Sequence, residues 1–410
     1  MKQVLLISFD IIKDGEPPIS LSIGSLLSSL KQKVLYGNFF TIEHISFNLY
    51  KLAPINIEYI INKIKSKYDV SKFDKIAISC YVWSQYVINE LIKELKNKGF
   101  KGKIILGGNQ ITYSNNNEKK YPGCNIFITG YGEDSLLKAI CSDDNKVLTF
   151  SSTPDFSTLP SPYLTKEIPV KYMQKKVRFE TKRGCIYKCK FCAHKNLQNN
   201  NIYYHSKKRI FDELLYFKEK NVEKINFTDP TFNSGKGYLD ILKFCQEIGM
   251  KSKLSLQIRH EKINNNKGFE LIELCKSLNC IIEFGLQTIN KKEMNVLGRQ
   301  TNLDKTRHFI KKLNQKNIPF EVSLIYGIPG QTLKSFKKSV TFLIDNGCTN
   351  IKAYGLMLLE GTALWKMKNE LRCFETCEGK YAIPYVTSSE SFTREEWLEM
   401  KNFAETLMKQ

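Results

Sequence analysis

Three closely spaced cysteines offer the clearest chemistry in this 410-residue chain. Cys185, Cys189 and Cys192 are spaced C-x3-C-x2-C, so one loop can turn their thiolates onto a common centre. Soft thiolate ligands select zinc or iron–sulfur clusters. A structural zinc site takes four ligands, and His194 lies too close to Cys192 in sequence to serve easily as the fourth. Three ligands on a 4Fe–4S cluster instead leave one iron open to a further ligand, so the spacing favours a cluster, with a structural zinc loop as the alternative.

The elements that must position this loop are predicted to be of the α/β class. From residue 1 to about residue 145, apolar stretches typical of strands alternate with segments of helical periodicity. Strands are expected at 4–8, 75–80, 103–107 and 125–130, and helices at 19–30, 57–64, 87–95 and 134–139. Strands separated by helices form parallel sheets, which predicts a doubly wound, Rossmann-like domain over residues 1–145.

A linker and a second domain are predicted to follow. Residues 146–170 contain four X-Pro steps and little periodicity, which is typical of a linker. Over residues 171–362 apolar strands recur with helices between them, which predicts a partial (β/α)6 barrel. The cysteine loop then lies where βα loops of barrels build active sites. Residues 363–410 are expected to form a short helical tail that includes a cysteine-bearing segment.

The cysteine segment resembles the radical S-adenosylmethionine (radical SAM) superfamily, whose signature is C-x3-C-x2-C with an aromatic residue just before the last cysteine. The resemblance implies a 4Fe–4S cluster whose open iron binds S-adenosylmethionine, and reductive cleavage to a 5′-deoxyadenosyl radical. It also implies cofactor contacts from later strand ends, although the Gly-Gly-Glu motif of many members is replaced here by Thr228-Asp229-Pro230. The cofactor-binding candidates are Phe191, Thr228, Asp229, Gln257, Arg259, Gln287, Arg299, Tyr326, Gly327 and Ile328.

The first domain resembles the cobalamin-binding domains that are fused to some radical SAM enzymes. The resemblance rests on four segments, at residues 17–24, 78–83, 106–109 and 130–133, and on the linker 159–163. It implies cobalamin as a further cofactor, with Ser79, Trp83, Gly107 and Gly108 as candidate contacts. The D-x-H-x-x-G motif that supplies a histidine to cobalt is absent, so bound cobalamin would lack a histidine lower ligand. A domain that keeps the fold without the cofactor is the alternative.

These resemblances lead to one main functional hypothesis and two alternatives. The main hypothesis is a cobalamin-dependent methyltransferase that acts on an unactivated carbon of a peptide or natural-product intermediate. The first alternative is a radical SAM peptide epimerase, or another non-methylating radical enzyme, in which Cys373 or Cys377 returns a hydrogen atom to the substrate. The second is an RNA-modifying enzyme, suggested only by the formal net charge of +21.

Composition limits the partners and the compartment. A basic chain favours acidic partners, but no clear basic stripe with interleaved aromatics is present, so nucleic acid is not favoured. The expected partners are a small-molecule or peptide substrate and an external electron donor of the flavodoxin or ferredoxin type. No apolar stretch approaches the roughly 20 residues of a membrane span. No secretory signal is evident, so a cytoplasmic protein with reduced thiols is expected.

Overall fold

The computed structural model describes residues 1–52, 54–194 and 201–408. The chain divides into two compact units. The N-terminal unit comprises Met1–Val170 with Glu378–Ile383, and the C-terminal unit comprises Lys171–Cys377 with Pro384–Gln410. No helix among the described residues is long and apolar enough to cross a membrane.

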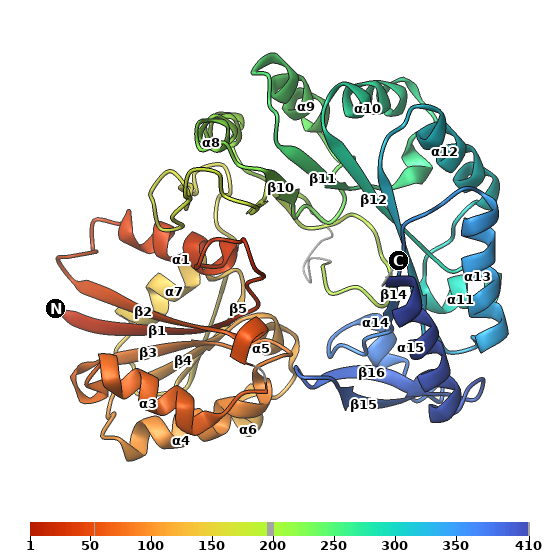
Figure 1. Cartoon of the computed structure of the whole chain (residues 1–410). Helices are drawn as coiled ribbons and strands as arrows, with labels where there is room; N and C mark the ends of the chain where they lie inside the picture. Colours follow the sequence, from red (N-terminus) through yellow and green to blue (C-terminus); the bar gives the residue numbers. More distant parts are fainter. Residues whose placement is uncertain (53, 195–200, 409–410) are drawn as a thin grey trace. The chain divides into compact units, whose positions relative to one another are not determined.

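The N-terminal unit is built on a parallel six-stranded sheet in the order β2-β1-β3-β4-β5-β6 (Figure 1). Its strands are β1 (Lys2–Asp10), β2 (Phe40–Asn48), β3 (Lys75–Ser79), β4 (Lys103–Gly107), β5 (Ile126–Gly130) and β6 (Leu148–Ser152). The strands β1, β3 and β4 are buried on both faces, which explains their continuous apolar runs.

Helices cover both faces of this sheet. They are α1 (Leu21–Lys31), α2 (Leu49–Leu52), α3 (Ile57–Lys67), α4 (Ile88–Asn97), α5 (Asn109–Tyr113), α6 (Asn117–Lys120) and α7 (Gly132–Cys141), with 3-10 turns at Val70–Lys72 and Gln85–Val87. The apolar residues of α1 and α7 pack in one core cluster, and those of α3 and α4 pack in another. Helices on both faces of a parallel sheet make this unit doubly wound, as predicted.

The C-terminal unit has a second parallel six-stranded sheet, in the order β14-β13-β12-β11-β10-β7. Its strands are β7 (Val177–Phe179), β10 (Lys224–Phe227), β11 (Lys253–Gln257), β12 (Cys280–Gln287), β13 (Phe320–Tyr326) and β14 (Ile351–Gly355), and the short pair β8 (Lys182–Arg183) and β9 (Tyr203–Tyr204) lies outside the sheet. The sequential order and the parallel pairing give the predicted partial (β/α)6 barrel.

The helices of this unit before residue 346 lie on the outer side of the curved sheet, and those after residue 362 lie beside its last strands (Figure 1). They are α8 (Lys207–Glu219), α9 (Tyr238–Glu247), α10 (Asn266–Ser277), α11 (Lys291–Leu297), α12 (Leu303–Gln315), α13 (Leu333–Asp345), α14 (Ala363–Lys366) and α15 (Arg394–Met408), with a 3-10 turn at His260–Lys262. Along β12 every second residue is buried and the others are half-buried, so the strand presents a covered face and a more open face.

The structure corrects the sequence reading at three places. The segments Phe40–Asn48 and Leu148–Ser152 are strands that were not predicted, and both lie at the edges of their sheet. Edge strands alternate apolar and polar residues, and β6 is also short, so part of the predicted linker 146–170 belongs to the sheet. The predicted helical tail also contains two antiparallel strands, β15 (Phe374–Glu378) and β16 (Ile383–Ser388), between α14 and α15.

Candidate active site

The cysteine loop leaves the carboxyl end of β7 through a narrow stem. The strands β8 and β9 pair antiparallel, Lys182 with Tyr204 and Arg183 with Tyr203, and so bring the two ends of the loop together. Gly184 follows at a φ of +92°, and a Cβ atom there would lie 2.2 Å from the Asn201 carbonyl oxygen. Only glycine fits both this backbone conformation and this close approach. The loop therefore begins at a fixed point of the barrel rim.

Asp229 clamps the chain just before the cysteines. Its buried carboxylate accepts hydrogen bonds from Thr181 N at 2.8 Å, from Thr181 Oγ1 at 2.5 Å and from Lys182 N at 3.3 Å. Lys182 is also buried, and its Nζ donates to the carbonyl oxygens of Phe232 and Ser234. Asp229 was expected to contact S-adenosylmethionine, but both of its carboxylate oxygens bind the cysteine-bearing segment, so the structure supports a positioning role.

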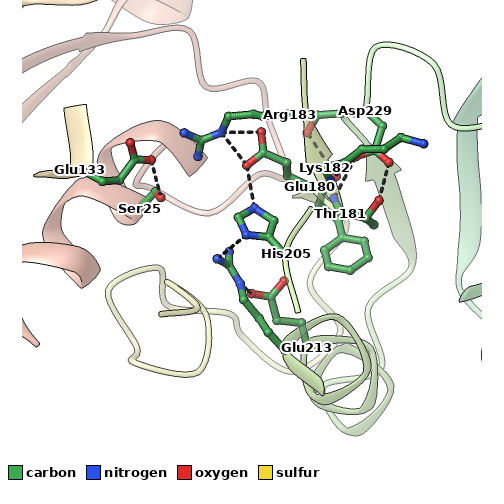
Figure 2. A network of polar contacts seen from close by, with 12 residues as sticks. Ser25, Glu133, Glu180, Thr181, Lys182, Arg183, His205, Glu213 and Asp229 are labelled. Carbon is green, nitrogen blue, oxygen red and sulfur yellow. Dashed lines mark hydrogen bonds and ion pairs between the residues drawn. The ribbon is translucent and has the colours of Figure 1, made fainter. Parts of the chain in front are cut away.

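A chain of charged side chains holds the other side of the stem (Figure 2). Arg183 Nε donates to both Glu180 oxygens at 2.9 and 3.0 Å. Arg209 donates to His205 Nδ1 at 2.9 Å, so His205 Nε2 carries a hydrogen and donates to Glu180 Oε2 at 3.1 Å. Burial opposes ionisation of Glu180, but Arg183 and His205 outweigh it and lower the pKa of this carboxyl to about 2. The ionised Glu180 thus fixes both ends of the stem.

The three cysteines lie in a partly buried group. Cys185 and Cys189 are buried and Cys192 is half-buried. Burial raises the pKa of Cys192, and the nearby Cys189 and Cys185 raise it further, which is the effect of thiols held close together. Among the described residues, no three His, Cys, Asp or Glu side chains are arranged to hold a single metal ion. A 4Fe–4S cluster takes each thiolate on a different iron, and this donor set of three soft ligands fits it.

Two arginines lie beside the cysteine loop, Arg259 just after strand β11 and Arg299 just after helix α11. Arg259, after β11, donates from Nη2 to Cys189 Sγ at 3.0 Å, and its guanidinium lies 3.9 Å from the centre of the Tyr187 ring. Arg299 donates to the Gly285 carbonyl oxygen, and its buried Nε has no hydrogen-bond partner in the described part of the chain. Burial lowers the pKa of Arg299, and Arg259 lowers it further. Buried and incompletely paired guanidinium groups fit an anionic ligand such as a carboxylate.

Gln287 and Arg299 meet at the end of β12. The strand has an irregular register between Gly285 and Gln287, and Gln287 has a φ of +68°. A Cβ on Gly285 would lie 2.1 Å from Gln287 Nε2 and 3.3 Å from Arg299 Nη1. Gly285 therefore leaves the space that both side chains occupy. A bulge of this kind re-aims side chains next to a site, and the sequence pattern alone did not predict it.

The turn Tyr326-Gly327-Ile328 after β13 is held from two sides. Gln331 Oε1 accepts from Gly327 N at 2.8 Å and from Ile328 N at 3.3 Å. Gly327 has a φ of +80°, and a Cβ there would lie 3.0 Å from Trp397 Nε1 of α15. The backbone at this turn is thus rigid and closely packed, as support for a flat ring requires.

Of the remaining predicted site residues of this unit, one makes a local hydrogen bond, and the cofactor contacts of the other two stay predictions. Thr228 Oγ1 donates to the Phe179 carbonyl oxygen at 3.2 Å, Gln257 is exposed at the end of β11, and Phe191 is half-buried. The sequence reading did not find Tyr187, Glu180 or His205. Tyr187 lies within the cysteine motif, so its position was visible, but its contact with Arg259 joins residues that are distant in sequence.

In the N-terminal unit the predicted residues lie at the carboxyl ends of the neighbouring strands β3 and β4. Ser79 Oγ accepts from Phe9 N at 3.0 Å, and Trp83 Nε1 donates to the Phe9 carbonyl oxygen at 2.9 Å. Gly108 has a φ of +119°, and a Cβ there would lie 2.5 Å from the Cys80 carbonyl oxygen. A strand order that reverses between β1 and β3 places a binding crevice at this edge of the sheet.

His44 lies inside a polar network of the N-terminal sheet. Its Nε2 is 3.0 Å from Ser8 Oγ, and Ser8 Oγ donates to Asp10 Oδ2 at 2.6 Å. Ser46 Oγ donates to the same carboxylate oxygen at 3.0 Å. Burial lowers the pKa of His44 to about 4. This histidine is therefore part of the β1–β2 pairing.

The two tail cysteines differ in environment. Cys373 is buried, and its Sγ donates to the Lys368 carbonyl oxygen at 3.6 Å. It lines a cavity of about 410 Å³ together with Lys368, Asn369, Arg372, Phe374, Ser389 and Glu390. Burial raises the pKa of Cys373. Cys377 is exposed on β15. A role for either thiol as a hydrogen donor stays a prediction.

The cysteine loop, its stem and the two arginines lie in a part of the chain that matches a known family. Residues 179–343 match the model of the Radical SAM superfamily. The chain carries a radical SAM domain, and the 4Fe–4S cluster and S-adenosylmethionine are the cofactors of that domain.

Curated relatives extend beyond this domain. The chain is 22% identical over 325 residues to the cobalamin-dependent radical SAM methyltransferase TokK of Streptomyces tokunonensis, which covers 71% of this chain and 48% of TokK. It is 22% identical over 311 residues to the 2-(S-pantetheinyl)-carbapenam-3-carboxylate methyltransferase of Streptantibioticus cattleyicolor, which covers 67% and 45% of the two chains. The chain thus spans about half the length of these curated relatives.

Solved structures share the fold of both units. TsrM, a radical S-adenosylmethionine methyltransferase from Kitasatospora setae, matches with a TM-score of 0.70 at 12% identity, covering 99% of this chain and 89% of TsrM. OxsB, a cobalamin-dependent S-adenosylmethionine radical enzyme, matches with a TM-score of 0.70 at 15% identity, covering 98% and 66%. A second structure of TsrM, with cobalamin and a 4Fe–4S cluster bound, has a TM-score of 0.67. The predicted fold class is confirmed.

Proposed function

We propose that this chain is a cobalamin-dependent radical SAM methyltransferase that acts on an unactivated carbon of a peptide or natural-product intermediate. The observation that carries the proposal is the cysteine loop, which is anchored at the carboxyl rim of the partial barrel with Arg259 on Cys189. The named relatives TokK and TsrM are methyltransferases and share this chain's domain types, which supports the choice of reaction.

The residues of the C-terminal unit would bind and orient the cofactors. Cys185, Cys189 and Cys192 would hold the cluster, and Asp229 and Glu180 keep their loop in place. Arg299, whose Nε has no hydrogen-bond partner among the described residues, would take the carboxylate of S-adenosylmethionine. Gln287 would donate to the ribose, and the backbone of Phe191 and of Tyr326-Gly327-Ile328 would lie against the adenine. When bound, these cofactors supply the radical that activates the substrate and the methyl group that it receives.

The substrate is proposed to be polar. Half-buried polar residues occur on β10, β12 and β13, and they include Lys224, Glu283 and Glu321. Burial raises the pKa of Glu321, and the negative charge of Glu283 raises it further. The two carboxyl groups therefore lie near one another on the sheet. Such a face suits a small molecule or peptide with several hydrogen-bonding groups. Radical SAM enzymes also need an electron donor, for which a flavodoxin or ferredoxin type is proposed.

The test is anaerobic reconstitution with iron, sulfide and cobalamin, followed by reaction with S-adenosylmethionine that carries a deuterated methyl group. We expect an iron–sulfur chromophore, a cobalamin spectrum and release of 5′-deoxyadenosine from the reduced protein. The triple variant C185A/C189A/C192A should lose the cluster and all release of deoxyadenosine. Cys348→Ala is the matched control, because Cys348 is a buried thiol of the same unit whose pKa burial raises to about 11. Failure to bind cobalamin would contradict the methyltransferase proposal.

The same experiment separates methylation from the epimerase alternative. A deuterated methyl group in the product supports methyl transfer, whereas solvent deuterium without a gain of methyl mass supports epimerisation. Cys373→Ser and Cys377→Ser should leave a methyltransferase active within about twofold, because neither thiol has a place in methyl transfer. Loss of product with Cys373→Ser at unchanged deoxyadenosine release would favour the hydrogen-donor alternative.

A further inference from the structure

Arg259 is fixed more firmly than a simple ligand-binding arginine requires. Its backbone is paired in both directions with the buried Asn233, which donates from Nδ2 to the Arg259 carbonyl oxygen and accepts from Arg259 N, both at 2.9 Å. Its side chain is only 12% exposed, with Nη1 3.9 Å from Glu261 Oε1. The guanidinium also covers the Tyr187 ring at 3.9 Å. These contacts leave the side chain little freedom.

This fixed group ends on the sulfur of a cluster ligand. Arg259 Nη2 donates to Cys189 Sγ at 3.0 Å, a short contact for a sulfur acceptor. A hydrogen bond to a ligand sulfur withdraws electron density from the metal and stabilises the more negative, reduced state of an iron–sulfur cluster. The planar fork of arginine holds one nitrogen toward Cys189 and the other toward Glu261 in a fixed geometry, whereas a lysine presents a single nitrogen on a flexible stem.

We propose that Arg259 is a positioning residue that raises the reduction potential of the cluster by donating a hydrogen bond to the Cys189 thiolate. The proposal rests on the proposed function only in requiring that a cluster is bound. The reduction itself is a one-electron transfer from the external donor to the cluster, and Arg259 gains and loses no proton in it. Its consequence is that an electron donor of moderate potential can reduce this enzyme.

Three variants separate the hydrogen bond from charge and from folding. Arg259→Gln removes both the charge and the guanidinium fork. Arg259→Lys keeps the charge but loses the fork. Lys262→Gln is the matched electrostatic control, because Lys262 Nζ lies 5.8 Å from the centre of the same Tyr187 ring. It therefore removes one positive charge from the same neighbourhood and leaves the hydrogen bond to Cys189 in place.

The measurement is a redox titration of the reconstituted cluster without S-adenosylmethionine or substrate, read by the electron paramagnetic resonance signal of the reduced state. Arg259→Gln should lower the ratio of reduced to oxidised cluster about tenfold at a fixed poise, which equals about 59 mV for a one-electron couple. Arg259→Lys should show a smaller fall, and Lys262→Gln the smallest.

Other results of the titration would contradict either the role of Arg259 or the proposed function. An unchanged midpoint in Arg259→Gln, or an equal fall in Lys262→Gln, overturns the role of the hydrogen bond while the proposed function stands. If Arg259→Gln does not retain a cluster, then Arg259→Lys decides, and a wild-type midpoint in that variant overturns the proposal. Absence of a cluster from the wild-type protein would overturn both the inference and the proposed function.

Discussion

In the N-terminal unit the predicted polar residues at the carboxyl strand ends have hydrogen-bond partners within the unit, whereas in the C-terminal unit two polar groups beyond the strand ends do not. Ser79 and Trp83 bind the backbone of Phe9, and Asp10 accepts from two serines. In the C-terminal unit, Arg299 Nε and Glu261 Oε2 are buried without a hydrogen-bond partner among the residues that the structure describes. Both sheets have six parallel strands, so strand number and direction do not cause the difference.

The polar groups at the N-terminal strand ends complete their hydrogen bonds within the fold, whereas those of the C-terminal unit need a ligand to complete theirs. Unpaired buried polar groups cost free energy, and a fold retains them where a bound molecule completes their hydrogen bonds. The N-terminal edge can bind a cofactor through backbone and shape, as its glycine at the end of β4 indicates. The C-terminal edge binds through charge. Changes at the two edges should therefore have separate effects.

The largest effect is expected from Asp229→Ala. It leaves two backbone N–H groups and the Thr181 hydroxyl without their acceptor beside the buried Lys182, and should destabilise the C-terminal unit by about 3 kcal/mol. Hydrogen exchange of β10 and β12 amides measures the loss, and iron content should fall with it. Asp240→Ala, which breaks only an exposed pair with Lys207, is the control and should change stability by less than about 0.5 kcal/mol. Equal effects of the two variants would contradict the clamp.

A smaller effect is expected from Gly108→Ala in the N-terminal unit. The added Cβ meets the Cys80 carbonyl oxygen at a positive φ, so we expect a loss of about 2–3 kcal/mol and weaker cobalamin binding. Gly37→Ala is the matched control, because Gly37 has a φ of +80° with nothing within 4 Å of an added Cβ. It should lose only about 1 kcal/mol. Cobalamin absorbance and iron content check the result, and a loss of iron with retained cobalamin would reverse the comparison.

The smallest effect is a pH dependence that each unit carries by itself. Burial lowers the pKa of His44, and that of His260 in the C-terminal unit, to about 4. The unfolded chain then binds more protons between about pH 6.5 and pH 4, so stability is lost as the pH falls through this window. By pH 5.5 each histidine should contribute a loss of about 1.4 kcal/mol.

Hydrogen exchange at several pH values reads the two units separately. His44→Gln should flatten the profile of β1 and β3 amides and leave that of β12 amides unchanged, and His260→Gln should do the reverse. A variant that flattened both profiles would show that the two units do not unfold separately.

The sequence by itself determined both parallel sheets and most strand positions, and it predicts the three cluster ligands. Cys185, Cys189 and Cys192 are close together in sequence, so their spacing predicts an iron–sulfur site without knowledge of the fold. The strand β4 was predicted at its observed bounds, residues 103–107, because buried parallel strands are continuous apolar runs. The edge strands β2 and β6 were missed because their exposed residues break such runs.

Only the tertiary structure decided which groups meet around the cysteine loop. Arg259 is 70 residues from Cys189, and Asp229 is 48 residues from Thr181, so no periodicity links either pair. Arg259 was predicted at a strand end, but its donation to a ligand sulfur depends on the parallel register that aligns β11 with its neighbours. A strand end fixes where a residue sits along the barrel rim, and the packing of the whole unit fixes what its side chain touches.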